Sequence, residues 1–202
     1  MAMKRRSFRR HYGARRYRKL FIIAVEGEKT EPQYFNHIRS KSSTVCIKCL
    51  NSKHKSSAQQ VLRRMNTHLK ENSLYEGDEA WLVVDKDSNT DDRLSELYDW
   101  SIKQNNFNFA LSNPKFEFWL LLHFEDGNGI TSSRDCSERL KRYLPNYNKS
   151  IEAHKITHQQ ISDAVQRAQQ RDCPPCKDWP RTCGGTTVYK LIKNIRHADE
   201  PA

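Results

Sequence analysis

Short apolar runs alternate with helix-like segments along the first 126 residues. Leu20–Val25 and Trp81–Val84 are continuous apolar runs, typical of strands buried on both faces, and Thr44–Leu50 and Phe107–Leu111 predict two more strands. Strands that alternate with helices at this spacing indicate parallel pairing with right-handed crossovers. The pattern therefore predicts an α/β fold with a parallel sheet of about four strands and flanking helices.

The expected helices carry apolar residues three and four positions apart. Thr30 is the expected cap of the first, and Asn113-Pro114 are the expected cap and first position of a helix over Lys115–Phe124. That last helix is apolar nearly all round and should lie against the sheet. The apolar positions of the other three are Tyr34, Phe35 and Ile38; Ala58, Val61, Leu62, Met65 and Leu69; and Leu94, Leu97, Tyr98 and Ile102.

The alternation stops after residues 126–129, and three helical segments follow at Ser133–Tyr143, Thr157–Gln170 and Thr187–His197. We interpret residues 20–126 as an α/β core and residues 127–202 as a helical extension packed on it. Residues 1–19 precede the core as a basic tail that should be disordered when free, because it repels itself and offers no apolar surface to bury.

The charge of the chain is concentrated in that tail. The formal net charge is +11, and the first 20 residues hold nine basic residues and no acidic one. Such a segment is attracted to phosphate backbones through counterion release, so nucleic acid is the expected partner; a solubilising tail without a partner is the alternative. The nucleic-acid-binding candidates are Arg5, Arg6, Arg9, Arg10, Arg15, Arg16 and Arg18 in the tail, and Lys86 beyond it.

Three acidic residues follow two of the predicted strands. Glu26 comes directly after the first strand, and Asp85 and Asp87 come directly after the third. Ligands of open α/β sheets collect beyond the carboxyl ends of the strands, so the three carboxylates should converge if these strands are neighbours. Oxygen ligands of this kind suit Mg²⁺ or Mn²⁺. Gly27 would allow the tight turn that leaves Glu26 facing the crevice.

Other polar residues near these acids allow two interpretations each. Glu117, in an apolar helix, is either an outer ligand or orienting group of the site, or the partner of a structural salt bridge to Arg181 or Arg196. Lys29 and Lys86 flank the carboxylates and either bind phosphate or balance charge. His123 is interpreted as a hydrogen-bonded core histidine. The catalytic candidates are Glu26, Lys29 and Glu117.

Cysteine usage and hydropathy bear on the compartment. No apolar run approaches the length of a membrane span, and the run after the tail is too short for a signal peptide, so we expect a cytoplasmic protein with reduced thiols. Cys46 and Cys49 form one C-x-x-C pair, in a predicted strand, and Cys173 and Cys176 form another. A local zinc site that includes Cys183 is conceivable, although free thiols in a loop are the simpler interpretation.

Three motifs, in order along the chain, resemble the RloB-like family. They are Ala24–Glu31 (AVEGEKTE), Val84–Asp87 (VDKD) and Ser112–Phe124 (SNPKFEFWLLLHF), and a Thr-x-Val-x-x-Leu pattern follows over residues 186–191. The resemblance covers roughly residues 20–197. It implies a Toprim-like fold, in which Glu26 is the Toprim glutamate and Asp85 and Asp87 are the metal-binding pair.

The resemblance also implies a function. We expect a Mg²⁺- or Mn²⁺-dependent phosphodiesterase or nuclease that acts on RNA or DNA in anti-phage defence by abortive infection, beside an ATPase partner of the AAA or ABC type. The alternative is a non-catalytic nucleic-acid-binding or regulatory subunit of such an ATPase. In that case the basic tail carries the affinity.

Overall fold

The computed structural model describes residues 19–38, 45–51, 56–87, 89–151 and 155–199. Its centre is a five-stranded sheet in the order β2-β1-β3-β4-β5. The strands are β1 (Lys19–Val25), β2 (Val45–Leu50), β3 (Glu79–Asp85), β4 (Phe107–Asn113) and β5 (Gly185–Thr186). The first four run parallel, and β5 pairs antiparallel with the end of β4. The predicted α/β fold with a mostly parallel sheet is confirmed.

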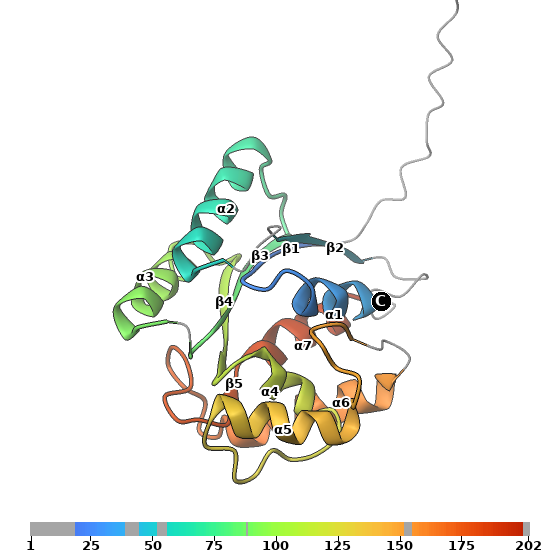
Figure 1. Cartoon of the computed structure of the whole chain (residues 1–202). Helices are drawn as coiled ribbons and strands as arrows, with labels where there is room; N and C mark the ends of the chain where they lie inside the picture. The colour runs from blue at the N-terminus through green and yellow to red at the C-terminus, as the bar shows by residue number, and fades with distance from the viewer. Residues whose placement is uncertain (1–18, 39–44, 52–55, 88, 152–154, 200–202) are drawn as a thin grey trace, which may run out of the picture.

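Helices cover both faces of the sheet (Figure 1). One face carries α2 (Ala58–Glu71) and α3 (Asp91–Ser101). The other carries α1 (Thr30–Ile38), α4 (Phe116–Leu121), α5 (Ser133–Tyr143), α6 (His158–Arg171) and α7 (Val188–Asp199). Side chains of successive strand residues point to opposite faces, so each strand contributes to both hydrophobic clusters. In β1, Ile22 packs toward α2 and Ile23 packs toward α1 and α4.

The segments before and after residue 126 share one of these clusters. It contains Phe21 and Val25 of β1 together with Leu140 of α5, Ala164 of α6 and Leu191 of α7. The C-terminal segment is helical, as expected, and it also supplies the fifth strand, β5, beside the four strands that the sequence indicated. Strand β5 has only two residues and is positioned by pairing with Ser112 and Asn113. Two residues are too short for any periodic signal in the sequence.

Four local predictions also differ from the structure. Asn113 ends β4 rather than capping a helix, and α4 covers only Phe116–Leu121 of the predicted Lys115–Phe124. The side chain of Asn113 instead donates to the carbonyl oxygens of Pro180 and Arg181. Thr30 is the first residue of α1 rather than the residue that caps it, and its hydroxyl donates to the carbonyl of Lys149. Ile102, expected on the buried face of α3, is the residue after that helix and is 63% exposed.

In the part of the chain that the structure describes, every helix is too short or too polar to span a bilayer. The predicted basic tail, except for Lys19, lies outside the described residues. Lys19 belongs to β1, and its ammonium group pairs with Glu79 at 2.5 Å.

Candidate active site

A cavity of about 540 Å³ lies at the carboxyl edge of the sheet. Strands β1 and β3 are adjacent, so their acidic ends meet there as the sequence predicted. Six carboxylates line the cavity. They come from the end of β1 and the turn after it, the first turn of α1, the end of β3, the loop after β3 and the first turn of α4: Glu26, Glu28, Glu31, Asp85, Asp87 and Glu117. So many like charges in one cavity raise the energy of the site unless cations or protons offset them.

Glu26 is tied to β3 by an asparagine. Its side chain is 2% exposed, and its Oε1 accepts a hydrogen bond from Nδ2 of Asn89 at 2.7 Å. The same Nδ2 donates to the backbone oxygen of Asp85 at 2.7 Å. Two acceptors on one amide nitrogen fix the orientation of the Asn89 side chain. Asn89 therefore holds the Glu26 carboxylate against the end of the neighbouring strand.

Asp85 connects β3 to the start of α4. Its Oδ1 accepts a hydrogen bond from the backbone N–H of Phe116 at 2.8 Å, so this aspartate caps the helix in place of the predicted Asn113. Burial raises the pKa of Asp85 well above its ordinary value, and the nearby carboxylates of Glu31, Glu26, Glu117 and Asp87 raise it further. A cation in the cavity would reverse that effect by favouring the ionised form.

Asp87 lies on the same side of the loop but is more exposed. Its Oδ2 accepts a hydrogen bond from the hydroxyl of Ser133, the first residue of α5, at 2.6 Å. Its backbone N–H donates to the carbonyl of Pro114 at 2.9 Å. Asp85 and Asp87 thus both face the α4 and α5 side of the cavity, as their spacing suggested.

Glu31 belongs to the cluster although the sequence indicated only a helix position for it. Its side chain is 6% exposed, and its Oε1 accepts a hydrogen bond from the backbone N–H of Gly27 at 2.8 Å. A β-carbon on Gly27 would lie 1.8 Å from Oε2 of Glu31. The glycine at this position is therefore explained by the close approach of the Glu31 carboxylate, rather than by the turn that was expected to direct Glu26.

We expect Gly27→Ala to displace the Glu31 carboxylate while the fold is retained. The clash falls on the far end of a flexible side chain, which can rotate away at the cost of one hydrogen bond, about 1 kcal/mol. Thermal unfolding should therefore shift by only a few degrees, and Mn²⁺ affinity measured by calorimetry should fall. Gly77→Ala is the control, because nothing lies within 4 Å of a β-carbon there and any strain at its positive φ leaves the cavity untouched. Unchanged Mn²⁺ binding by Gly27→Ala would argue against a role for Glu31.

Glu117 forms no salt bridge with either arginine proposed for it. Arg181 pairs with Asp91 and Asp178, and Arg196 donates to Ser162. Glu117 instead accepts a hydrogen bond from the hydroxyl of Tyr147 at 3.0 Å, and it is 8% exposed. The carboxylate thus lies in the wall of the cavity, which favours the interpretation that it belongs to the site.

His123 is a buried, hydrogen-bonded core residue, as predicted. It is 1% exposed, its Nδ1 lies 3.0 Å from the carbonyl of Trp119, and its Nε2 lies 3.0 Å from the hydroxyl of Tyr34. A carbonyl only accepts, so Nδ1 carries the proton and Nε2 accepts from the tyrosine. The contact joins α1, which carries Glu31, to the segment that follows α4.

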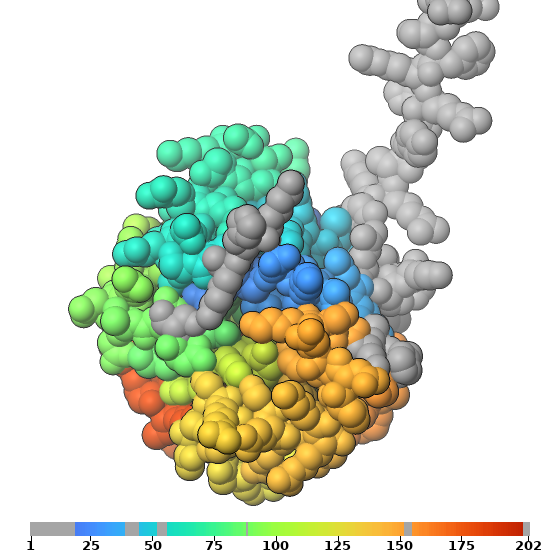
Figure 2. All heavy atoms as spheres, viewed as in Figure 1, coloured from blue at the N-terminus to red at the C-terminus, as the bar shows by residue number. Residues whose placement is uncertain are grey.

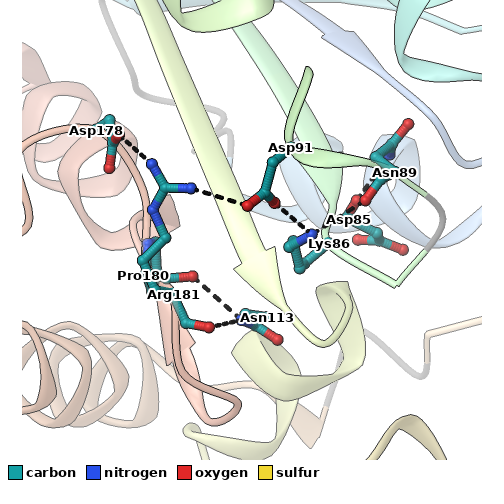
Figure 3. A network of polar contacts seen from close by, with 8 residues as sticks. All are labelled: Asp85, Lys86, Asn89, Asp91, Asn113, Asp178, Pro180 and Arg181. Carbon is teal, nitrogen blue, oxygen red and sulfur yellow. Dashed lines mark hydrogen bonds and ion pairs between the residues drawn. The ribbon is translucent and has the colours of Figure 1, made fainter. Parts of the chain in front are cut away.

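The two lysines that flank the acids have different surroundings. Lys29 lines the cavity with an exposed side chain. Lys86 is not among the lining residues; its ammonium group pairs with Asp91 at 2.8 Å and donates to the carbonyl of Asn89 at 3.1 Å. Figure 3 shows this pair next to Arg181, which reaches Asp91 at 3.2 Å from the C-terminal loop. The surroundings of Lys86 favour charge balance, and phosphate binding by Lys86 stays a prediction.

The donor atoms suit a divalent cation, but they are engaged within the protein. The carboxylate oxygens around Asp85 are the hard ligands that Mg²⁺ and Mn²⁺ prefer. Among the described residues, no three His, Cys, Asp or Glu side chains converge in an arrangement that would hold a metal. Asp85 would have to release the Phe116 N–H, or Asp87 the Ser133 hydroxyl, to turn further into the cavity.

Several lining residues were not anticipated from the sequence. Glu28, Glu31 and Lys115 lie inside the family-like motifs, so their position beside Glu26 and Glu117 was an available signal. The others come from α5 and the segment after it, where no pattern marks them: Ser137, Lys141, Tyr147, Asn148 and Lys149. The six cysteines are separate thiols, and among the described residues none of them belongs to a group of three side chains that would hold a metal.

Comparison with known proteins places the chain in a family. The family model described as RloB-like protein matches residues 21–195. No curated protein and no solved structure matches the chain. The matched segment begins in β1, ends in α7 and contains all six carboxylates of the cavity. Because the match covers most of the chain and its site, the protein belongs to the RloB-like protein family.

Proposed function

We propose that this protein is a Mg²⁺- or Mn²⁺-dependent phosphodiesterase that cleaves nucleic acid in defence against phage. The observation that carries the proposal is the convergence of six carboxylates and four lysines on one cavity at the carboxyl edge of a parallel sheet. Acidic residues in such a place suit a divalent cation, and lysines around them suit a phosphate-bearing substrate. The defence role and an AAA- or ABC-type ATPase partner rest on the family resemblance.

The residues have distinct roles in this proposal. Asp85 and Asp87, with Glu26, would hold the cation, which when bound polarises a phosphoryl oxygen and lowers the pKa of water. Glu26 or Glu117 would accept or deliver a proton at the reacting oxygen, according to which of them lies within hydrogen-bond reach of it. Lys29 would face the negative charge that develops on the phosphoryl group. Asn89 would keep the Glu26 carboxylate from rotating away.

The test is cleavage of labelled single-stranded and duplex DNA and RNA, with Mn²⁺ or with EDTA. It is run with the protein alone and beside a neighbour-encoded ATPase. We expect cleavage only with metal and its loss in Glu26→Gln, which keeps the size of the side chain and an acceptor for Asn89 while removing its charge. Glu76→Gln, at an exposed position away from the cavity, is the control. Equal cleavage by wild type and Glu26→Gln in Mn²⁺ would refute the proposal.

A second candidate is a non-catalytic nucleic-acid-binding or regulatory subunit. It is favoured by the hydrogen bonds that already engage Asp85, Asp87 and Glu117, since a structural network would look the same. The same experiment separates the two. Nucleic acid bound equally well in EDTA and left intact with either metal, with or without the ATPase, would support this candidate.

A further inference from the structure

The segment Tyr147-Asn148-Lys149 forms one wall of the acidic cavity, although it lies well over 100 residues after β1. The hydroxyl of Tyr147 donates to Glu117 and lies 3.0 Å from the hydroxyl of Thr30. Thr30 in turn donates to the backbone oxygen of Lys149 at 3.0 Å. In Figure 2 the blue segment that contains α1 lies against the orange segment that follows α5. These bonds fix the wall to the two helices that carry Glu31 and Glu117.

Lys149 has an unfavourable backbone conformation. Its φ is +60°, and it is the one non-glycine residue with positive φ among the described residues. Left-handed backbone is costly for a residue with a β-carbon and persists where the surroundings impose it, often at functional sites. Here the hydrogen bond from Thr30 contributes to that restraint. Lys149 is exposed and lines the cavity.

Lys149 is one of four lysines on the cavity. Lys29 precedes α1, Lys115 is the residue before α4, and Lys141 lies on the exposed face of α5. Within the described residues none of the four forms an ion pair, and the ammonium group of Lys115 donates to the hydroxyl of Ser137 at 2.6 Å. Unpaired cations held beside a carboxylate cluster indicate a ligand that carries negative charge of its own.

We propose that Lys149, together with Lys115 and Lys141, binds the phosphate groups of the nucleic-acid strand along this wall. The cavity is within the size range of small-ligand sites, so it has room for a nucleotide and its phosphates rather than for a full duplex cross-section. The identity of the ligand rests on the proposed function, but this binding requires neither metal nor cleavage. Lys149 would position the strand while the carboxylates act on it.

The test is binding of a fluorescent 12-nucleotide single strand to the full chain in EDTA, measured by anisotropy at several salt concentrations. Lys149→Asn removes the charge and keeps a residue that tolerates left-handed backbone. We expect weaker binding and a decrease of about 0.7 in the slope of log K against log salt, the value for one lost contact to a single strand. Lys149→Arg keeps the positive charge, so it should keep the affinity and the salt slope of wild type. Lys141→Gln, on an exposed helix face, should show a similar loss without any risk to the wall.

Lys103→Ala is the matched control, because it removes an exposed lysine beyond the end of α3 and away from the cavity. The basic residues before β1 are the same in all variants, so their contribution to the affinity cancels in the comparison. If Lys149→Asn and Lys141→Gln bind as tightly as Lys103→Ala, with the same slope, the inference is overturned even when Glu26→Gln has lost cleavage. If no metal supports cleavage but the dependence on Lys149 holds in EDTA, the inference stands and the proposed function fails.

Discussion

Replacing Asp85 with asparagine is expected to abolish cleavage and, in EDTA, to make the protein more stable. The carboxylate is half-buried at the cavity, and its desolvation raises its pKa well above the ordinary value. The neighbouring carboxylates of Glu31, Glu26, Glu117 and Asp87 raise this pKa further. Asparagine keeps an oxygen to accept the Phe116 N–H and adds an amide that can donate to the neighbouring carboxylates. Removing the repulsion should raise the free energy of unfolding by about 1 kcal/mol, or about 2–4 °C in a chain of this size.

The cleavage activity of Asp85→Asn should fall, although its stability in EDTA rises. Loss of one positioned charged group from a catalytic site typically lowers the rate by about 10²- to 10⁴-fold. In Mn²⁺ the order of stability should also reverse, because a ligand that binds only the folded state stabilises it by about 2.7 kcal/mol at 100 times its Kd. Wild type should gain this stabilisation, and Asp85→Asn should gain little of it.

The measurement is thermal unfolding of both proteins in EDTA and in Mn²⁺, beside the cleavage assay. Asp99→Asn is the control, since Asp99 is an exposed carboxylate on α3 away from the cavity. It should melt like wild type in both conditions. If Asp85→Asn melted below wild type in EDTA and Mn²⁺ shifted both equally, the carboxylate would be a structural residue rather than part of a metal site.

The sequence predicts the residues at the centre of this site because their positions follow from patterns of neighbouring residues in the chain. The apolar runs of β1 and β3 end at Glu26 and Asp85, and any parallel arrangement that makes these strands neighbours brings the two acids together. The Asp-x-Asp spacing likewise places Asp87 on the same side. These conclusions need only the period of a strand and the direction of the chain.

The rest of the site depends on contacts that no local pattern contains. Glu31 is positioned by its bond to the Gly27 N–H, which looks like ordinary first-turn chemistry until the packing is known. Tyr147 and Lys149 reach the cavity through hydrogen bonds to Thr30 that join residues more than 115 positions apart. The capping of α4 by Asp85, rather than by Asn113, is a long-range contact of the same kind.

Acid is expected to lower the stability of the protein through His123. Burial lowers the pKa of this imidazole from 6.5 to about 4. The unfolded chain therefore binds a proton between pH 6.5 and 4 while the folded protein does not, so the free energy of unfolding falls as the pH decreases through that range. The full stabilisation is present above pH 6.5, and the loss by pH 4 is on the order of 3 kcal/mol, a large part of typical stability.

Urea unfolding of wild type and His123→Asn at pH 7.5 and pH 4.5 isolates this contribution. The asparagine amide can replace the donor to the Trp119 carbonyl but cannot take up a proton. At pH 7.5 the variant should have a lower free energy of unfolding than wild type. Between pH 7.5 and pH 4.5 its free energy of unfolding should fall by less, because every other titrating group is common to both proteins. Equal losses would show that His123 takes up its proton without unfolding. The imidazole accepts from Tyr34 of α1, so its protonation would loosen the helix that holds Glu31, and acid would weaken the fold and the carboxylate cluster through one contact.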